Sequence, residues 1–191
     1  MKPQFHKVPL LANSSYVARH EFKRQHTETN WHYHPEMELV YIKRGNGSRY
    51  IGNNISPFES GEIILLGENI PHIWRFNKDA SATGHQMDAE ALSIHFHPEC
   101  LGKDIFQLQE AYLLPRLFEK AKSGLEVKGE AREKVAAFML EAMEATNLDR
   151  IIILLRILKT LAESTDLSPI CISHNVPPKS SEYDQARLNE I

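Results

Sequence analysis

The sequence contains little cysteine, no long apolar run and no excess of positive charge. Its two cysteines, Cys100 and Cys171, lie far apart and form no metal-binding or disulfide pattern, which fits a reducing compartment. The longest apolar run, Ile151–Leu155, is much too short to span a bilayer. The first residues, MKPQFHKVPL, lack the apolar core of a signal peptide. We therefore expect a cytoplasmic protein with no membrane partner.

The charge balance argues against direct contact with nucleic acid. Asp and Glu (25) outnumber Lys and Arg (22), the net charge is -3, and the sequence shows no basic stripe and no helix-turn-helix pattern. A glycine-rich phosphate loop is also absent, and no Ser or Cys has a recognisable catalytic partner. The 42% hydrophobic and 25% charged content is that of an ordinary globular protein, and 191 residues suffice for one sizeable core.

The most informative stretch begins with two histidines, His32 and His34, which Glu38 follows four residues later. Residues of equal parity share one face of an extended strand, so these side chains and Glu36 are expected on one side. A second segment, Gly61 to Leu66, leads to His72. Three imidazoles and one carboxylate can hold a divalent metal such as Zn, Ni, Fe or Mn. The same side chains could instead be hydrogen-bonded groups that line a dry pocket.

Residues 1–103 predict a β-structure of short strands separated by Gly and Asn turns, typical of a sandwich or barrel. The expected strands are 37–42, 49–51, 62–66, 72–76 and 90–97, with a polar excursion over 77–88. Glu38 shares its strand face with Val40 and Ile42, so polar groups at one end of that face give way to apolar groups at the other. This pattern favours a barrel with a site at its mouth.

Residues 104–165 show helical periodicity instead. We expect helices at 105–121, with Pro115 kinking or dividing it, at 130–146 and at 148–163. The third is apolar on more than one face, which indicates burial on more than one side. Either it packs between the barrel and another helix, or Ile152, Ile153 and Ile157 form a homodimer interface.

Residues 166–191 are expected to form a linker and the start of a further helix. The stretch 164–182 is rich in Ser and Pro, and 183–191 begins with helical character but has only two turns and no terminator. The simplest interpretation is that the chain is part of a longer protein.

Residues 32–45 match the first cupin motif: HxH, three residues, Glu, six residues and Gly. Residues 61–72 resemble the second cupin motif, with Gly61 and His72 at the motif spacing. All four ligand positions of the cupin family are present, as His32, His34, Glu38 and His72. The resemblance implies a mainly β fold, a cupin barrel (double-stranded β-helix or jelly roll), followed here by a small α-helical subdomain.

The chain departs from the second cupin motif at three positions. The family's proline is Gly67 here, its second glycine is Asn69, and its closing asparagine is Phe76. In addition, His26 stands where a glycine precedes the first histidine of the first motif. These departures bear on metal binding more than on the fold.

The order of parts resembles the N-terminal region of an AraC-type transcriptional regulator, in the form common in Bacteroides-like bacteria. Residues 31–74 carry the resemblance most strongly, and IIILLRILKTLAES at 151–164 and DQARLNEI at 184–191 also match. The resemblance implies a non-enzymatic sensing domain, a homodimer, and DNA binding only through a C-terminal domain that these residues do not contain. The effector would be a small polar metabolite, for example a sugar, and would act by linkage.

The residues expected to contact the effector combine the motif side chains with aromatic and cationic neighbours. An aromatic face beside a guanidinium suits a polar ligand that has one flat apolar side. For each wall residue, simple core packing is the alternative. The effector set is Trp31, His32, His34, Glu38, Tyr41, Arg49, His72 and Trp74, with Tyr50 as a further wall residue. A second pair, His95 and His97, is expected to be structural because no acid stands at a useful spacing from it.

Two other function classes compete with the sensor interpretation. A mononuclear metal cupin enzyme, such as a dioxygenase, isomerase or epimerase, would use the same four ligands, with Glu36 or His95 as acid or base. A stand-alone binding module would need no downstream domain. The helical C-terminal half and the Pro-rich linker favour the sensor, because neither has an obvious catalytic purpose.

Overall fold

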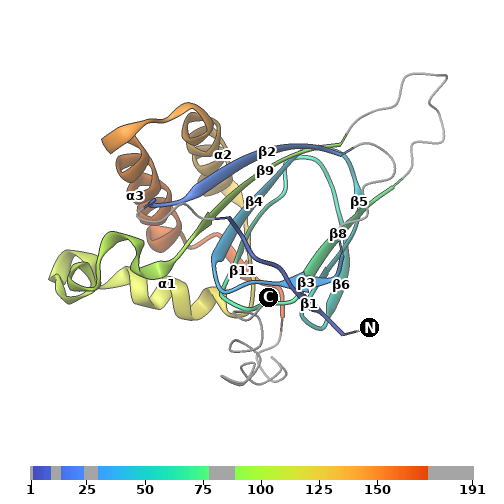
Figure 1. Cartoon of the computed structure of the whole chain (residues 1–191), viewed down its shortest axis with the longest axis horizontal. Coiled ribbons are helices and arrows are strands. Elements are labelled where there is room, and N and C mark those ends of the chain that lie inside the picture. The colour runs from blue at the N-terminus through green and yellow to red at the C-terminus, as the bar shows by residue number, and fades with distance from the viewer. Residues whose placement is uncertain (1, 10–13, 24–29, 78–88, 172–191) are drawn as a thin grey trace.

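The computed structural model describes residues 2–9, 14–23, 30–77 and 89–171. Its strands form two sheets that face each other as a barrel (Figure 1). The five-stranded sheet has the order β1 (Gln4–Phe5), β3 (His32–Tyr33), β8 (His72–Phe76), β5 (Gly47–Ile51) and β6 (Asn54–Phe58). The six-stranded sheet has the order β11 (Leu167–Pro169), β10 (Leu125–Val127), β7 (Ile63–Leu66), β4 (Met37–Arg44), β9 (Ala89–Phe96) and β2 (Val17–Lys23). The predicted mainly β barrel with an α-helical part is confirmed.

The central strands of the six-stranded sheet, β7, β4 and β9, are largely buried on both faces, and their sequences reflect this. Along β4, Leu39 packs with the helices, whereas Val40 and Ile42 belong to a second apolar cluster inside the barrel. All four residues of β7 are buried, so this strand reads as a continuous apolar run rather than an alternating one. The protein therefore has two apolar cores, one on each side of the same sheet.

The helices cover the outer face of the six-stranded sheet (Figure 1). They are η1 (Pro98–Leu101), η2 (Lys103–Gln107), η3 (Gln109–Ala111), α1 (Leu113–Ala121), α2 (Gly129–Glu144) and α3 (Asn147–Glu163). The helix expected from residue 105 is replaced by short 3-10 turns until Leu113. Pro115 lies in the first turn of α1, where its missing N–H removes no helical hydrogen bond. None of the helices among the described residues has the length and apolar character needed to cross a membrane.

The prediction for the apolar faces of α3 needs correction. Ile153 and Ile157 are 7% and 1% exposed and belong to the core between the helices and the six-stranded sheet, so they cannot face a dimer partner. The exposed apolar side chains of this helix are Leu148, Ile151 and Ile152. Because α3 packs against both α1 and α2, a wide apolar surface is needed within one chain.

The predicted linker begins later than expected. Leu167–Pro169 forms β11, which pairs with β10. Ile170 then donates its backbone N–H to Gly124 O (2.9 Å) and Cys171 donates its own to Ser123 O (2.8 Å). The chain is therefore fixed to the six-stranded sheet through residue 171. The remainder of the expected linker and the helix expected at 183–191 lie outside the described residues, as does most of the polar excursion at 77–88.

Candidate functional site

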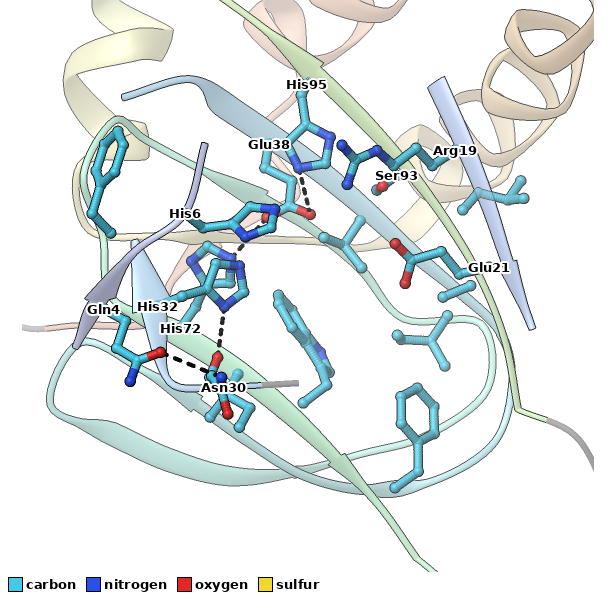
Figure 2. A pocket seen from close by; sticks show the side chains of 18 residues that line it. Gln4, His6, Arg19, Glu21, Asn30, His32, Glu38, His72, Ser93 and His95 are labelled. Atoms are coloured by element: carbon cyan, nitrogen blue, oxygen red, sulfur yellow. Dashed lines mark hydrogen bonds and ion pairs between the residues drawn. The ribbon is translucent and has the colours of Figure 1, made fainter. Parts of the chain in front are cut away.

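A cavity of about 340 Å³ lies inside the barrel, between the two sheets (Figure 2). One end is polar and the other is apolar. The polar lining residues are Gln4, His6, Arg19, Glu21, Asn30, His32, Glu38, His72, Ser93 and His95. The apolar lining residues are Phe5, Val40, Ile42, Ile73, Trp74, Phe76, Ala91 and Leu92.

The motif residues come together, although they do not share one strand. His32 lies in β3 of the five-stranded sheet and Glu38 in β4 of the six-stranded sheet, so the chain crosses between sheets at Pro35 and Glu36. His72 in β8 is the direct register partner of His32. Glu36 was expected on the same side as these residues, but it does not join them. Its carboxylate lies on the far side of His34, 3.5 Å from His34 Nδ1.

Glu38 lies at the centre of the polar end. Its Oε2 atom is 3.3 Å from His34 Nε2 and 3.0 Å from His72 Nε2. Its other oxygen, Oε1, is 3.2 Å from His95 Nε2. Burial by itself raises the pKa of Glu38, but the charges and hydrogen bonds of the neighbouring histidines outweigh burial and hold this pKa well below its usual value. Glu38 is therefore an ionised carboxylate inside the barrel.

Backbone carbonyls orient three of the imidazoles. His32 Nδ1 donates to Asn30 O (2.7 Å), His34 Nδ1 to Glu36 O (3.1 Å) and His72 Nδ1 to Ile70 O (2.8 Å). Each of these bonds leaves the Nε2 atom of its ring facing the others. Such outer hydrogen bonds are the usual support of metal-binding or ligand-binding histidines.

His34 and His32 hold their protons differently. His34 Nε2 also hydrogen bonds to Glu38 Oε2, so both ring nitrogens face acceptor atoms, which favours the protonated form of His34. Burial lowers the pKa of His34, but the hydrogen bond and charge of Glu38 raise it further than burial lowers it. At His32, burial and then the neighbouring His72 lower the pKa to about 4.

His95 belongs to this site, contrary to the expectation that it is merely structural. It is 4% exposed, and the acid that it was thought to lack is Glu38, which lies directly opposite it across the β4–β9 pair. The spacing in sequence could not show this partner, because it comes from a different strand. His97, the other member of the pair, lies outside the cavity with a 48% exposed side chain near Glu36.

The departures from the second cupin motif have structural reasons. Gly67 donates its backbone N–H to Ala121 O (2.9 Å), a bond that a proline could not make. Asn69 has a φ of 58°, a left-handed conformation that asparagine tolerates in place of glycine. Phe76 lines the cavity and packs edge-on against Phe58, with ring centroids 4.9 Å apart. The changed residues thus fit the helical part and the apolar end of the cavity.

The predicted wall residues divide into two groups. Trp74 lines the cavity. Arg49 does not, because its guanidinium is bound by Glu62 and lies 3.7 Å from Glu126. Tyr41 faces the opposite side of its strand and packs against the helix-covered core.

The two remaining wall predictions are also corrected, because neither Trp31 nor Tyr50 lines the cavity. Tyr50 instead carries the Arg75 guanidinium over its ring, 5.0 Å from the centroid.

Sequence analysis missed the contribution of β1 and β2. Gln4 and Phe5 of β1 and the following His6 reach the cavity, and Arg19 and Glu21 reach it from β2. The alternating segment VARHEFK is a signal for a half-buried strand, but nothing in it shows that its charged residues face inward.

The histidine cluster has the composition and orientation that a metal site requires. Two sets of side chains have ligand atoms within 4.8 Å of one another: His32, His34 and His72, and His34, Glu38 and His95. Imidazoles whose Nδ1 atoms are already hydrogen-bonded to carbonyls present Nε2 as the ligand, so these residues fit a transition-metal ion.

The sequence model described as AraC-like ligand binding domain matches residues 14–142. Among solved structures, the AraC-like transcriptional activator CuxR is similar at 11% identity, with a TM-score of 0.45, over 94% of this chain and 63% of that one. ToxT from Vibrio cholerae is similar at 15% identity, with a TM-score of 0.48, over 86% of this chain and 61% of that one. This chain therefore spans about three fifths of the length of either protein. A comparison with curated protein sequences gives no match.

We predict that His32 stays neutral in the folded protein at pH 5.5, because its pKa is lowered to about 4. An unfolded chain takes up this proton near pH 6.5, so the stability that His32 contributes is present above that pH and is lost as the pH falls toward 4. Long-range nitrogen–proton NMR spectra of the imidazoles measure this directly. A His32 signal that titrates near pH 6.5, the ordinary value for histidine, would contradict the prediction.

Proposed function

The chain belongs to the AraC-like ligand-binding domain family, and on that premise we propose that it is the sensing and dimerisation part of a bacterial transcriptional regulator. It binds a small polar metabolite, such as a sugar, inside the barrel. It passes the signal to a helix-turn-helix domain that these residues do not contain. The observation that carries the proposal is the cavity of about 340 Å³, which lies between two sheets and is polar at one end and apolar at the other.

The lining suits a small amphipathic molecule. Glu38, His32, His72 and His95 offer acceptors and donors at one end, whereas Trp74 and other apolar side chains offer a flat surface further in. The volume is near the lower limit for ligand pockets, which favours a metabolite over a large ligand.

A short path of contacts leads from the cavity toward the end of the described chain. His72 is the register partner of Ile51 in β5, and Gly52 donates its backbone N–H to Pro71 O (2.8 Å). Cys171 Sγ contacts Ile51 O at 3.0 Å. A ligand that prefers one position of His72 therefore biases the position of the chain at residue 171. It can do so only by its difference in affinity for the two positions.

The exposed apolar side chains of α3 support a homodimer. Leu148, Ile151 and Ile152 are 65%, 37% and 45% exposed, and Leu140 of the adjacent α2 is 44% exposed. This dimer face, residues 140, 148, 151 and 152, keeps Ile152 of the predicted interface and leaves out Ile153 and Ile157. Exposed apolar side chains on neighbouring helices are typical of protein interfaces.

We also propose that the histidine cluster can hold one divalent metal ion. The ligands would be drawn from His32, His34, Glu38, His72 and His95. A bound ion would supply a Lewis acid that attracts an oxygen atom of the effector. The residues of the chain would orient that ion and exclude water from it.

For the sensor proposal, a library of small polar metabolites, including sugars, is screened by thermal unfolding. A ligand at about 100 times its Kd stabilises a domain of this size by about 2.7 kcal/mol and raises Tm by roughly 5 to 10 °C. Ala91 lines the cavity, so Ala91→Leu fills part of it and should abolish the shift. Ala137→Leu, on the exposed surface of α2, is the matched control. If no compound in the library raises Tm, or if the rise in Tm persists in Ala91→Leu, the cavity is not the binding site of such a metabolite.

For the metal, chain stripped with EDTA is dialysed against Zn, Ni, Mn or Fe(II), and the bound metal is measured by mass spectrometry. We expect about one ion per chain in the wild type. His72→Ala should reduce the affinity by about 10- to 100-fold or more, because it removes a ligand. His20→Ala, whose side chain is 37% exposed on the outside of the barrel, should change nothing. Equal metal content in both variants would place any bound metal elsewhere.

For the dimer, the mass in solution is measured by light scattering at several concentrations. Ile152→Lys places a charge in the dimer face and should weaken association by about 10- to 100-fold or more. Ile55→Lys is the matched control, because Ile55 is 67% exposed on β6 of the other sheet. If the wild type is a monomer at every concentration, or if Ile152→Lys dimerises as the wild type does, the dimer face is wrong.

A further inference from the structure

We propose that the effector is a small monocarboxylic acid with an apolar body, and that Arg19 and Ser93 bind its carboxylate. The inference rests on the proposed function, because it names the chemical class of the molecule that the cavity binds. It concerns a part of the cavity wall that neither cupin motif contains.

The two residues are direct neighbours on the inner face of the six-stranded sheet. β2 and β9 pair antiparallel, and the register places Arg19 opposite Ser93 and Val17 opposite His95. Side chains that stand opposite in such a pair have their Cβ atoms about 4.5–5.5 Å apart. Arg19 and Ser93 both line the cavity, and Figure 2 shows them beside His95 on one side of it.

Several polar atoms of this wall have no partner within the described part of the chain. Ser93 is 7% exposed, and its hydroxyl makes no hydrogen bond. His95 Nδ1 is buried and unpartnered as well. Arg19 makes no hydrogen bond or ion pair with any described residue, whereas the buried Arg49 is bound by Glu62 and Ser56.

Unpartnered buried polar atoms such as the Ser93 hydroxyl are rare in folded proteins, since they lose their bonds to water without replacement, whereas Arg19 is half-buried. The donors on this wall match one acceptor group in particular. A guanidinium presents parallel N–H groups that fit the two oxygens of a carboxylate, and the neighbouring hydroxyl can donate to one of the same oxygens.

The surrounding charges favour a single negative charge on the ligand. Arg19 is the cation of this wall, while Glu38 is an ionised carboxylate nearby and Glu21 lines the same cavity. A dianion such as a phosphate monoester would place its second charge close to these carboxylates, which repel it. A neutral polyol carries no charge to pair with the guanidinium and so forgoes a charge-assisted hydrogen bond.

The rest of the cavity indicates the body of the acid. Ala91 follows Ser93 along the inner face of β9, and Val40, Ile42, Trp74 and Phe76 continue the lining. Apart from the indole of Trp74, these side chains offer no hydrogen bond to a hydroxyl-rich body. An aliphatic chain or an aromatic ring fits this surface.

The test measures binding of hexanoate and benzoate by calorimetry, with hexanamide and benzamide as uncharged counterparts. EDTA is present throughout, so that no metal on the histidine cluster contributes. We expect at least one acid to bind, and its amide to bind about 10- to 100-fold more weakly, as expected for the loss of a charge-assisted contact. Arg19→Gln should weaken the acid by a similar factor, and Ser93→Ala by several-fold. Arg75→Gln is the control, because Arg75 is exposed and stacks on Tyr50 outside the cavity.

Several results would overturn the proposal. These are the absence of binding by both acids, equal binding of acid and amide, or unchanged binding of the acid by Arg19→Gln. If Arg19→Gln does not fold, the comparison of acid with amide on the wild type and on Ser93→Ala decides the question. Neutral sugars are titrated in parallel. If a sugar binds and Ala91→Leu abolishes that binding while the acids fail, the carboxylate inference is wrong and the sensor proposal stands. If neither acids nor the metabolite library bind, both are wrong.

Discussion

The buried carboxylate of Glu38 is the constraint on which the rest of the barrel depends. An ionised group that is removed from water must be paired and hydrogen-bonded, or it destabilises the fold by several kcal/mol. Its partners His34, His72 and His95 come from the crossing between sheets, from β8 and from β9. To bring them within about 3 Å of one carboxylate, the two sheets must face each other in one register. The polar end of the cavity can therefore form only when the two sheets are aligned in this way.

The six-stranded sheet connects this site to the core beneath the helices. Its inner face supplies Glu38, Ser93 and His95 to the cavity, whereas its outer face packs against the helices through residues such as Leu39 and Ile94. A change on the inner face cannot move a strand without disturbing the outer core, because close-packed interiors resist such shifts. The five-stranded sheet has no such cover in the described chain, and β5 and β8 belong to it. The contacts from His72 through Ile51 to Cys171 use this less restrained sheet.

The sequence could predict whatever depends on local spacing. The motif positions His32, His34, Glu38 and His72 converge as the spacing indicated, and β4 alternates between its two faces as expected. The predictions that failed depended on partners far away in sequence. Arg49 has the right character for a cavity wall, but Glu62 and Glu126 bind it. His95 was set aside for want of an acid, although strand pairing places Glu38 opposite it.

The same limit explains Arg19, Ile153 and Ile157. An arginine in an alternating strand is ordinarily a solvated residue, and only the pairing of β2 with β9 turns Arg19 toward the cavity. An isoleucine on a wide apolar helix face can pack within the chain or against a second chain. Ile153 and Ile157 pack within the chain, because α3 lies against α1 and α2. Charged or polar groups that lack a partner among the described residues are therefore more informative than apolar ones. Their loss of hydration has to be compensated by something, and inside this barrel the available space for that compensation is the cavity.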